Sequence, residues 1–416
     1  MNRPAIPGQP TEHVNDKETP TVTAPARFID IHVLQSVPFA NLNRDDANAI
    51  KTVQYGNALR TRVSSQCWKR ATRTDFQQRI GQAALRTRRF GEGVARELKR
   101  RGWPADFADR AGAHVAVASG FKFELATQRD EAGKRRAIPN KVLTNVLVYT
   151  PDTAVAELAN LAEQHRDKLE GAKDITASKD KSVLPSAPVK NVLGSRNGVI
   201  HLFGRMLAEI DGATVDGAVQ VAHALTTHAT DVEVDYFSVV DDFTADWDDE
   251  TGSGHMGHAE YSAGTFYRYA TVDVRALTDN VGDDPRAVRD LVGAFLASFI
   301  ESLPRAKKNA TAPHTIPDLV HIAVRSDRPL SYAAAFEEPV RAASTGGFSA
   351  NSARQMADYA QAVNTLLGAG RVLSAGWAGL RAEELKGLGQ RHVSFEELIA
   401  AALRSALPQD DHGAAA

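Results

Sequence analysis

The segment RTRVSSQCWKRATR, at residues 60–73, carries the side chains with the clearest chemistry in this sequence. Five of its residues are Arg or Lys, none is acidic, and the polar run at 64–66 stands before Lys69 and Arg70. Cations, hydroxyls and the free N–H groups of a helix start are common contacts of a phosphate group. The segment therefore predicts binding to a polyanion; the alternative is a solvated, positively charged helix face.

The charge of the chain is strongly segregated along the sequence. The whole chain has 49 Lys and Arg against 51 Asp and Glu, which gives a formal net charge of −2. Residues 60–101 contain thirteen Lys or Arg and three acids, whereas residues 231–250 contain nine acids and no Lys or Arg. The local field is therefore a better guide to binding partners than the net charge.

The histidines and the single cysteine do not form a recognisable metal site. His223 and His228 are five residues apart on an expected helix, which is not the i, i+4 spacing of a helical zinc pair. His255 and His258 lie in a Gly-rich stretch without a third ligand nearby. Cys67 alone excludes an intrachain disulfide and a multi-cysteine metal site. We expect no cofactor and no metal.

The sequence shows no signal for secretion or for membrane insertion. The leader, residues 1–26, lacks the apolar core of a signal peptide. The sequence contains no run of 18 apolar residues, so we expect no membrane span. The lone cysteine fits a reducing compartment. We expect a cytoplasmic protein with no membrane partner.

The elements that would position the cationic segment can be read from periodicity. Residues 28–36 alternate apolar and polar, which predicts a half-buried strand, and a helix capped by Ser64 or Ser65 should follow residues 60–66. The expected order continues with a helical insertion, a helix at 215–229, a strand at 262–274, a helix at 285–303 and a strand at 318–330. We interpret the overall order of strand, helix, long insertion, strands, helix and strand as an α+β, ferredoxin-like β-α-β-β-α-β core interrupted by extra elements, which is the scaffold of RNA-recognition domains.

Five short motifs then occur in a fixed order between residues 42 and 270. They are LNRDD (42–46), RTRVSSQCWKRATR (60–73), GRM (204–206), VDGAVQVAHALTTH (215–228) and GTFYRYA (264–270). Together they resemble the backbone subunit of the type I-E CRISPR surveillance complex, Cascade, which is the Cas-seven (CasC) family. The likeness runs from about Phe28 to about Val340 and is interrupted by the insertion.

The resemblance implies a hand-like architecture with a ferredoxin-like, RNA-recognition-like palm, a helical finger insertion and an extended thumb loop. The implied divisions are a disordered leader (1–26), palm (27–80, 191–230 and 263–345), helical fingers (81–190), thumb loop (231–262), C-terminal helical region (346–405) and tail (406–416).

The resemblance also implies a non-catalytic subunit that polymerises along a CRISPR RNA guide (crRNA). Copies would stack head to tail, and the thumb would kink the guide so that its bases can pair with target DNA in antiviral defence. The implied partners are crRNA, target DNA through the crRNA, further copies of the chain and the other Cascade subunits.

Site residues follow from the same resemblance, and a guide bound in any sequence must be held by its phosphates. The implied RNA-binding residues are Arg44, Lys51, Ser64, Gln66, Lys69, Arg70 and Met206, and the implied base wedges of the thumb are Tyr236, Phe237 and Met256. An apolar wedge needs no charge, so the acids of 231–250 would point away from the guide, and some would meet the basic face of a neighbouring copy. Arg60 and Arg62 could share the RNA face or pair with acids.

Two other classes of function remain open at this stage. One is a metal-dependent endoribonuclease of the type III backbone-subunit kind, using Asp45 or Asp46; otherwise we expect Asp46 to brace Arg44 or to cap the following turn. The other is a monomeric RNA-binding module, which would bind RNA without length-dependent cooperativity.

Overall fold

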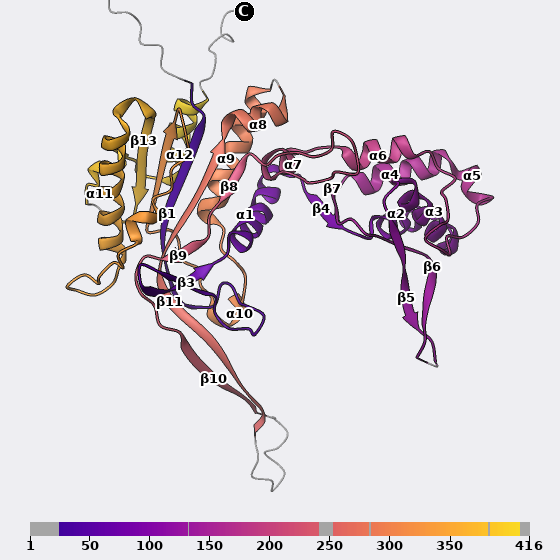
Figure 1. The fold of residues 1–416 in the computed structure, drawn as a ribbon, viewed down its shortest axis with the longest axis horizontal. Helices are drawn as coiled ribbons and strands as arrows, with labels where there is room; N and C mark the ends of the chain where they lie inside the picture. The colour runs from indigo at the N-terminus through magenta and orange to yellow at the C-terminus, as the bar shows by residue number, and fades with distance from the viewer. Residues whose placement is uncertain (1–24, 132, 241–252, 283, 382, 408–416) are drawn as a thin grey trace, which may run out of the picture.

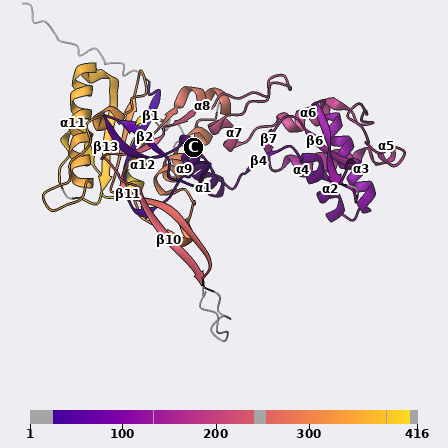
Figure 2. The same cartoon turned by 60° about the horizontal axis from the view of Figure 1, so that its bottom comes forward.

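The fold is organised around one long strand, β1 (Phe28–Ala40), at the centre of a ten-stranded sheet. The structure is a computed structural model that describes residues 25–131, 133–240, 253–282, 284–381 and 383–407. Figures 1 and 2 show a sheet-containing lobe, a second lobe beside it and an arm that projects away from both.

The strand order of the sheet is β14-β13-β12-β1-β11-β9-β3-β2, and β8 and β10 also pair with β11. The strands besides β1 are β2 (Thr52–Tyr55), β3 (Ala58–Val63), β8 (Val219–Val221), β9 (Ala224–Thr226), β10 (Glu233–Val240), β11 (Ser253–Asp273), β12 (Leu319–Arg325), β13 (Val372–Gly379) and β14 (Gln390–Arg391). Neighbours are antiparallel except for β13 and β14, which are parallel.

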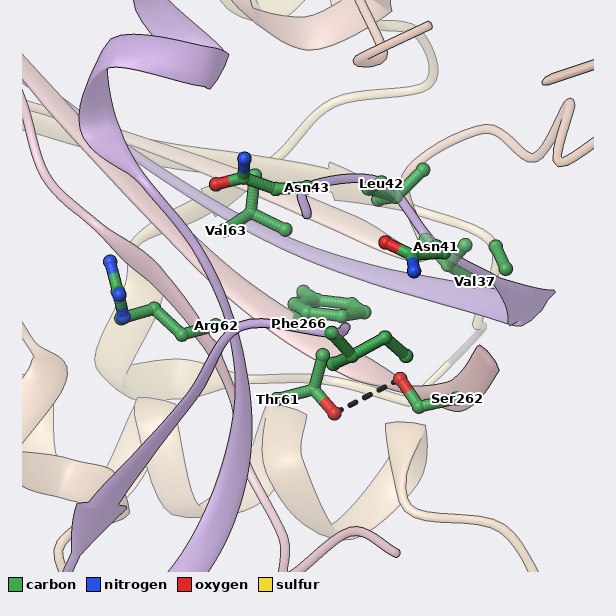
Figure 3. Close-up of a pocket in the computed structure, with 11 residues that line it drawn as sticks. Val37, Asn41, Leu42, Asn43, Thr61, Arg62, Val63, Ser262 and Phe266 are labelled. Atoms are coloured by element: carbon green, nitrogen blue, oxygen red, sulfur yellow. Dashed lines mark hydrogen bonds between the residues drawn. The ribbon is translucent and has the colours of Figure 1, made fainter. Parts of the chain in front are cut away.

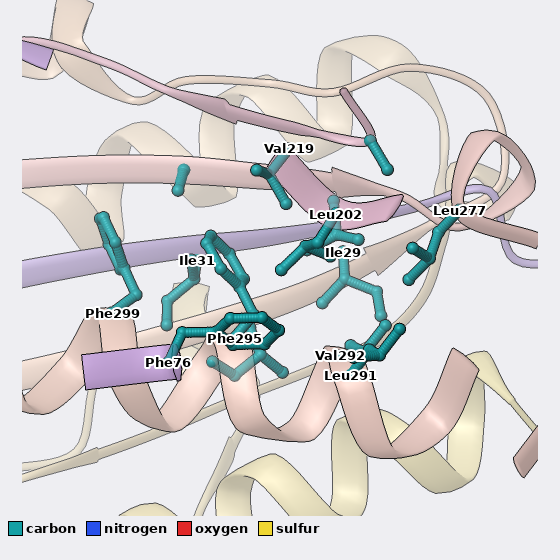
Figure 4. Packing of buried hydrophobic residues seen from close by; sticks show 14 of the residues in the cluster. Ile29, Ile31, Phe76, Leu202, Val219, Leu277, Leu291, Val292, Phe295 and Phe299 are labelled. Atoms are coloured by element: carbon teal, nitrogen blue, oxygen red, sulfur yellow. The ribbon is translucent and has the colours of Figure 1, made fainter. Parts of the chain in front are cut away.

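One face of the sheet packs on helices in the main hydrophobic core (Figure 4). Ile29 and Ile31 of β1 contribute to this core. The helices that contribute are α1 (Ser65–Ile80), α7 (Gly198–Phe203), α8 (Val274–Val281), α9 (Pro285–Glu301) and α12 (Phe395–Ala406). Helix α9 begins as its sequence predicts, because Asp284 accepts a hydrogen bond from the Ala287 N–H and Pro285 occupies the first turn.

The opposite face of β1 is also buried, so the prediction of a half-buried strand is wrong. The 3₁₀ turn η2 (Ala333–Phe336) and helix α11 (Ser349–Leu367) contribute to the core on that face. Asp30 accepts hydrogen bonds from Arg325 Nε and from the Tyr269 hydroxyl, each at 2.9 Å, and all three side chains are buried. His32 stacks on Tyr332 at 4.0 Å between ring centroids. Asp30 is thus paired by distant side chains and His32 is covered by one, so both are buried although their alternation with apolar residues looks solvent-facing in the sequence.

The second lobe has a hydrophobic core of its own, formed by residues between Phe90 and Ala213. Its elements are β4 (Ala84–Thr87), α2 (Phe90–Arg100), α3 (Ala105–Ala118), β5 (Phe123–Arg129), β6 (Arg135–Thr144), β7 (Val148–Pro151), α4 (Ala154–Gln164), α5 (Arg166–Glu170) and α6 (Ser186–Gly194). The segment was expected to be helical, but it contains two antiparallel strand pairs, β4–β7 and β5–β6. The β4–β7 pair lies where this lobe joins the sheet-containing lobe (Figure 1).

Three further expectations about secondary structure are corrected. Residues 215–229, expected to be a helix, contain β8 and β9, and the C-terminal region contains β13 and β14 beside its helices. Within the expected thumb loop, β10 and β11 pair as the hairpin of the arm, while residues 241–252 lie outside the described chain. Strands β8, β9 and β13 pair with strands distant in sequence, which local propensity does not encode, whereas β10 and β11 are consecutive strands of one hairpin. Among the described helices, none is long and apolar enough to cross a bilayer.

Candidate nucleic-acid interface

The start of α1 is fixed by its own polar turn. Ser64 is the N-cap: its Oγ accepts from the Cys67 N–H at 3.3 Å, and its own N–H donates to Asn43 Oδ1 at 2.9 Å. The predicted cap is therefore confirmed, but the Ser64 side chain is committed to the helix and the residue is only 8 % exposed. Gln66, one position into the first turn, is exposed.

A small pocket lies beneath this turn (Figure 3). Asn43, Val63 and Phe266 line it, and the Thr61 hydroxyl donates to Ser262 Oγ at 2.9 Å. Its volume is about 10 Å³, which is enough for one water molecule but not for a nucleotide. The pocket therefore supports the loop, and Arg62 points away from it toward the outside (Figure 3).

The loop before α1 presents Arg44 and Lys51. Arg44 is exposed and its guanidinium donates to Asn48 Oδ1 at 3.1 Å, while Lys51 is half-buried. Asp45, not Asp46, caps the turn, because its Oδ1 accepts from the Ala47 and Ala49 N–H groups at 2.9 Å each. The expectation that Asp46 braces Arg44 or caps the turn is therefore wrong: Asn48 contacts Arg44, and Asp45 caps the turn.

Lys69 and Arg70 leave α1 in different directions. Lys69 Nζ lies 3.5 Å from the Val219 carbonyl and 5.8 Å from the centre of the Phe203 ring. Burial, together with the nearby Arg86 and Arg73 guanidiniums, lowers the pKa of Lys69. Arg70 is exposed and lines a groove of about 670 Å³ formed between α1 and residues 301–314. A strand lying along α1 could reach either cation, on adjacent sides of the helix.

These cations lack internal counterions in the part of the chain that the structure describes. Arg44, Lys51, Lys69 and Arg70 form no salt bridge there, whereas the following Arg79, Arg88 and Arg89 pair with carboxylates. A cation without a carboxylate partner is available to an external anion, so the geometry favours phosphate binding over a self-paired surface.

Arg60 and Arg62 have separate environments, and no carboxylate pairs with either among the described residues. Arg60 is fully buried and donates to the carbonyls of Thr226 and Phe336, at 2.9 and 3.0 Å. Burial also lowers its pKa. Arg62 is half-buried, 3.0 Å from His223 Nδ1. Arg60 is therefore a structural side chain that joins the sheet to the turn at Phe336.

The expected wedge residues do not share one face of the arm. In the β10–β11 register, Tyr236 is opposite His258, Ser238 is opposite Met256, and Phe237 is opposite Gly257. Tyr236 and Met256 therefore lie on one face, 76 % and 73 % exposed, and Phe237 lies on the other at 46 %. Exposed Glu233 and Asp235 share the Phe237 face. Met206, far from the arm in sequence, is 86 % exposed.

Metal-binding geometry is absent from the described residues, which hold no group of three or more His, Cys, Asp or Glu able to bind an ion. His228 is buried, stacked on Phe348 at 3.5 Å, and lies 3.1 Å from the Thr265 N–H. The side chain of His255 lies outside the described set, and that of His258 is exposed beside Tyr236.

The chain belongs to the CT1975-like protein family, whose sequence model matches residues 29–401. It is also similar to chains of two solved structures. Each match covers 91 % of this chain and the full length of the matched chain. One is a "CRISPR RNA-guided surveillance complex, pre-nicking", at 42 % identity and a TM-score of 0.81. The other is a "CRISPR RNA-guided surveillance complex", at 37 % identity and a TM-score of 0.72. Curated protein sequences contain no match. The chain is therefore a homologue of a subunit of such complexes.

Proposed function

We propose that this chain is the non-catalytic backbone subunit of a type I-E Cascade complex and polymerises along crRNA. The observation that carries the proposal is the set of cations at and before α1 that have no carboxylate partner within the described chain. Similarity to chains of RNA-guided surveillance complexes supports the same function.

The palm of this proposal is a ferredoxin-like, RNA-recognition-like fold. Its support is the antiparallel order β12-β1-β11-β9, with α1 before β9 in the chain and α9 between β11 and β12. This is the order expected when a β-α-β-β-α-β unit folds into one sheet with its helices on one face. The lobe with its own core would be the fingers, and the β10–β11 arm would be the thumb.

The guide is held by its phosphates in this account. Arg44, Lys51, Lys69 and Arg70 supply the charge, and Gln66 supplies an exposed amide at the same turn. Ser64 contributes by fixing the start of the helix, because its hydroxyl oxygen accepts from the Cys67 N–H. Contacts of this kind carry no base information, so guides of any sequence would fit.

The bases are displaced by uncharged side chains. Tyr236 and Met256 are exposed on one face of the arm, which also carries Ser238 and His258, and Met206 is a third exposed apolar side chain. Stacking of a base on such a side chain is worth about 1–3 kcal/mol and depends little on base identity. Phe237, on the other face, would contact a different strand or a neighbouring copy.

Assembly into a head-to-tail filament would use the acidic arm against a basic surface of the next copy. Glu233 and Asp235 face away from Tyr236, so they need not approach the guide. Asp241 and Asp242 lie outside the described residues, and reversal of their charges should weaken assembly more than guide binding. Unchanged assembly would contradict this role.

Target DNA would pair with the exposed guide bases, and other Cascade subunits would cover the remaining faces.

The proposal is tested with RNAs of one length and unrelated sequences. Equal affinities and cooperative binding support a phosphate-held filament; sequence-dependent affinity or one copy per RNA would refute it. The same samples, given Mg²⁺ and complementary RNA, test the endoribonuclease. Regular cleavage that is lost in Asp46→Ala or Asp45→Ala would favour the enzyme over the non-catalytic subunit.

A further inference from the structure

Two arginines contact one tyrosine where the two lobes join, and Lys69 lies near them on α1. Arg73 of α1 donates to the Tyr149 hydroxyl at 3.1 Å, and its guanidinium carbon lies 5.6 Å from the centre of the Tyr149 ring. The Arg86 guanidinium carbon lies 4.9 Å from the same ring centre. Lys69 lies one turn before Arg73; burial lowers its pKa, and the nearby charges of Arg86 and Arg73 lower it in addition. We call these four side chains the junction cluster.

The strand pair β4–β7 fixes the geometry of the junction cluster. Arg86 of β4 is directly opposite Tyr149 of β7 in the antiparallel register. The Tyr149 ring is buried, while Arg86 is exposed above it. A guanidinium over an aromatic face is attracted by the negative charge of the ring face. The two guanidiniums therefore share one buried aromatic contact.

The charge of the junction cluster is uncompensated within the described chain. Lys69, Arg73 and Arg86 form no salt bridge there, although Arg88 and Arg89, the next arginines of the same segment, pair with Glu124 and Glu92. Three like charges in one place repel one another, and an unpaired set is stabilised when an anion binds. The same stretch of sequence thus provides both paired arginines and an unpaired cluster.

The position of the cluster extends the cationic side of α1. Gln66, Lys69 and Arg73 are spaced by three and four residues, which places them along one side of the helix. Arg86 of β4 lies over the same Tyr149 ring as Arg73, so the cationic surface extends across the lobe junction. A strand that follows α1 from its first turn would therefore reach the base of the second lobe.

We infer that the junction cluster is a binding site for a nucleic-acid backbone phosphate, with Arg86 as the contact supplied by the second lobe. The identity of the strand rests on the proposed function. The phosphate would belong either to the guide or to DNA paired with it, and both present the same phosphodiester chemistry. Tyr149 acts as a positioning residue, since its hydroxyl and ring hold the guanidiniums and its ring is buried.

The test compares Arg86→Gln with Arg89→Gln, which removes the same charge from a nearby arginine that is already paired with Glu92. Two affinities are measured between low and high salt. The first is the affinity of the protein for guide RNA alone. The second is the affinity of the preformed protein–guide complex for complementary single-stranded DNA. Loss of one phosphate contact should reduce the log–log salt slope by about 0.7 for a single strand. Tyr149→Phe, which keeps the ring but removes the Arg73 contact, should reduce affinity less than Arg86→Gln does.

Each outcome has a distinct meaning. A reduced slope for Arg86→Gln with guide alone assigns the site to the guide, and a reduced slope only after DNA is added assigns it to the target strand. If Arg86→Gln matches Arg89→Gln in both arms while the wild-type protein binds guide, the junction site is refuted and the proposed function stands. If the wild-type protein binds no RNA, the proposed function fails as well. Unchanged melting temperatures of both variants confirm that the exposed substitutions leave the fold intact.

Discussion

The arm permits a sharp prediction because its register separates two adjacent aromatic residues. Tyr236→Ala removes a ring that is 76 % exposed, and Met256→Ala removes its neighbour on the same face at 73 % exposure. Phe237 lies on the opposite face, where its ring covers Gly257: a Cβ added there would lie 2.5 Å from Phe237 Cζ. The Tyr236 ring is thus available to a base, while the Phe237 ring is partly engaged by the hairpin.

The expected magnitude follows from the stacking of one base per copy. A stacked base is worth about 1–3 kcal/mol, which corresponds to a loss of roughly 5- to 150-fold in affinity per bound copy. Folding stability should be almost unchanged in Tyr236→Ala, because an exposed ring contributes little buried apolar area. Phe237→Ala should instead lower the stability of the arm and affect guide affinity less.

The assay uses guides that carry a fluorescent adenine analogue at successive positions. Bright, unstacked positions should recur at regular intervals with the wild-type protein and disappear with Tyr236→Ala, with the double variant Tyr236→Ala/Met256→Ala showing the larger loss. The reasoning would be refuted if Tyr236→Ala kept both affinity and the periodic signal while Phe237→Ala removed them.

Other predictions concern the helix and the buried face of the sheet. Replacing Lys69 and Arg70 by Ala should lower the log–log salt slope of guide binding by about one to two units per copy, and an unaltered slope would exclude both from phosphate contact. Asp30→Ala leaves buried Arg325 without its partner and should cost about 3–5 kcal/mol in urea unfolding; a loss near zero would contradict the pairing. Burial lowers the pKa of His321 to about 4. Folding therefore favours the neutral form of this imidazole. The folding free energy is unaffected by this group above about pH 6.5, and the folded state loses stability as the pH falls from there toward the lowered pKa of the folded state. Melting temperatures should fall less steeply over this window in His321→Gln than in the wild-type protein, and parallel curves would argue against this assignment.

The sequence predicts local elements well where one apolar stripe or one cap decides the structure. Helix α9 and the Ser64 cap are such cases. It fails for β1, since Asp30 and His32 look solvent-facing until distant Arg325 and Tyr332 are seen to satisfy and cover them. Burial of paired polar groups depends on contacts between residues hundreds of positions apart, and periodicity contains no such information.

The candidate site shows the same division. The unpaired cations before and within α1 were visible in the sequence, but the junction cluster was not, because Tyr149 and Arg73 are separated by 76 positions. The sequence does indicate that the expected wedge residues lie on different faces of the arm. Tyr236 and Phe237 are adjacent, and adjacent side chains point to opposite faces in any extended strand. Treating that segment as a loop rather than a hairpin concealed it.

The central claim, a filament that grips a guide by its phosphates, is tested most directly by the mass of the complex as a function of guide length. The purified protein is mixed with guides of increasing length and unrelated sequence, and the number of copies per RNA is measured by native mass spectrometry. We predict that one copy is added for each constant increment of length, whatever the sequence. A single copy on every guide, or a number that depends on sequence rather than length, would contradict the account.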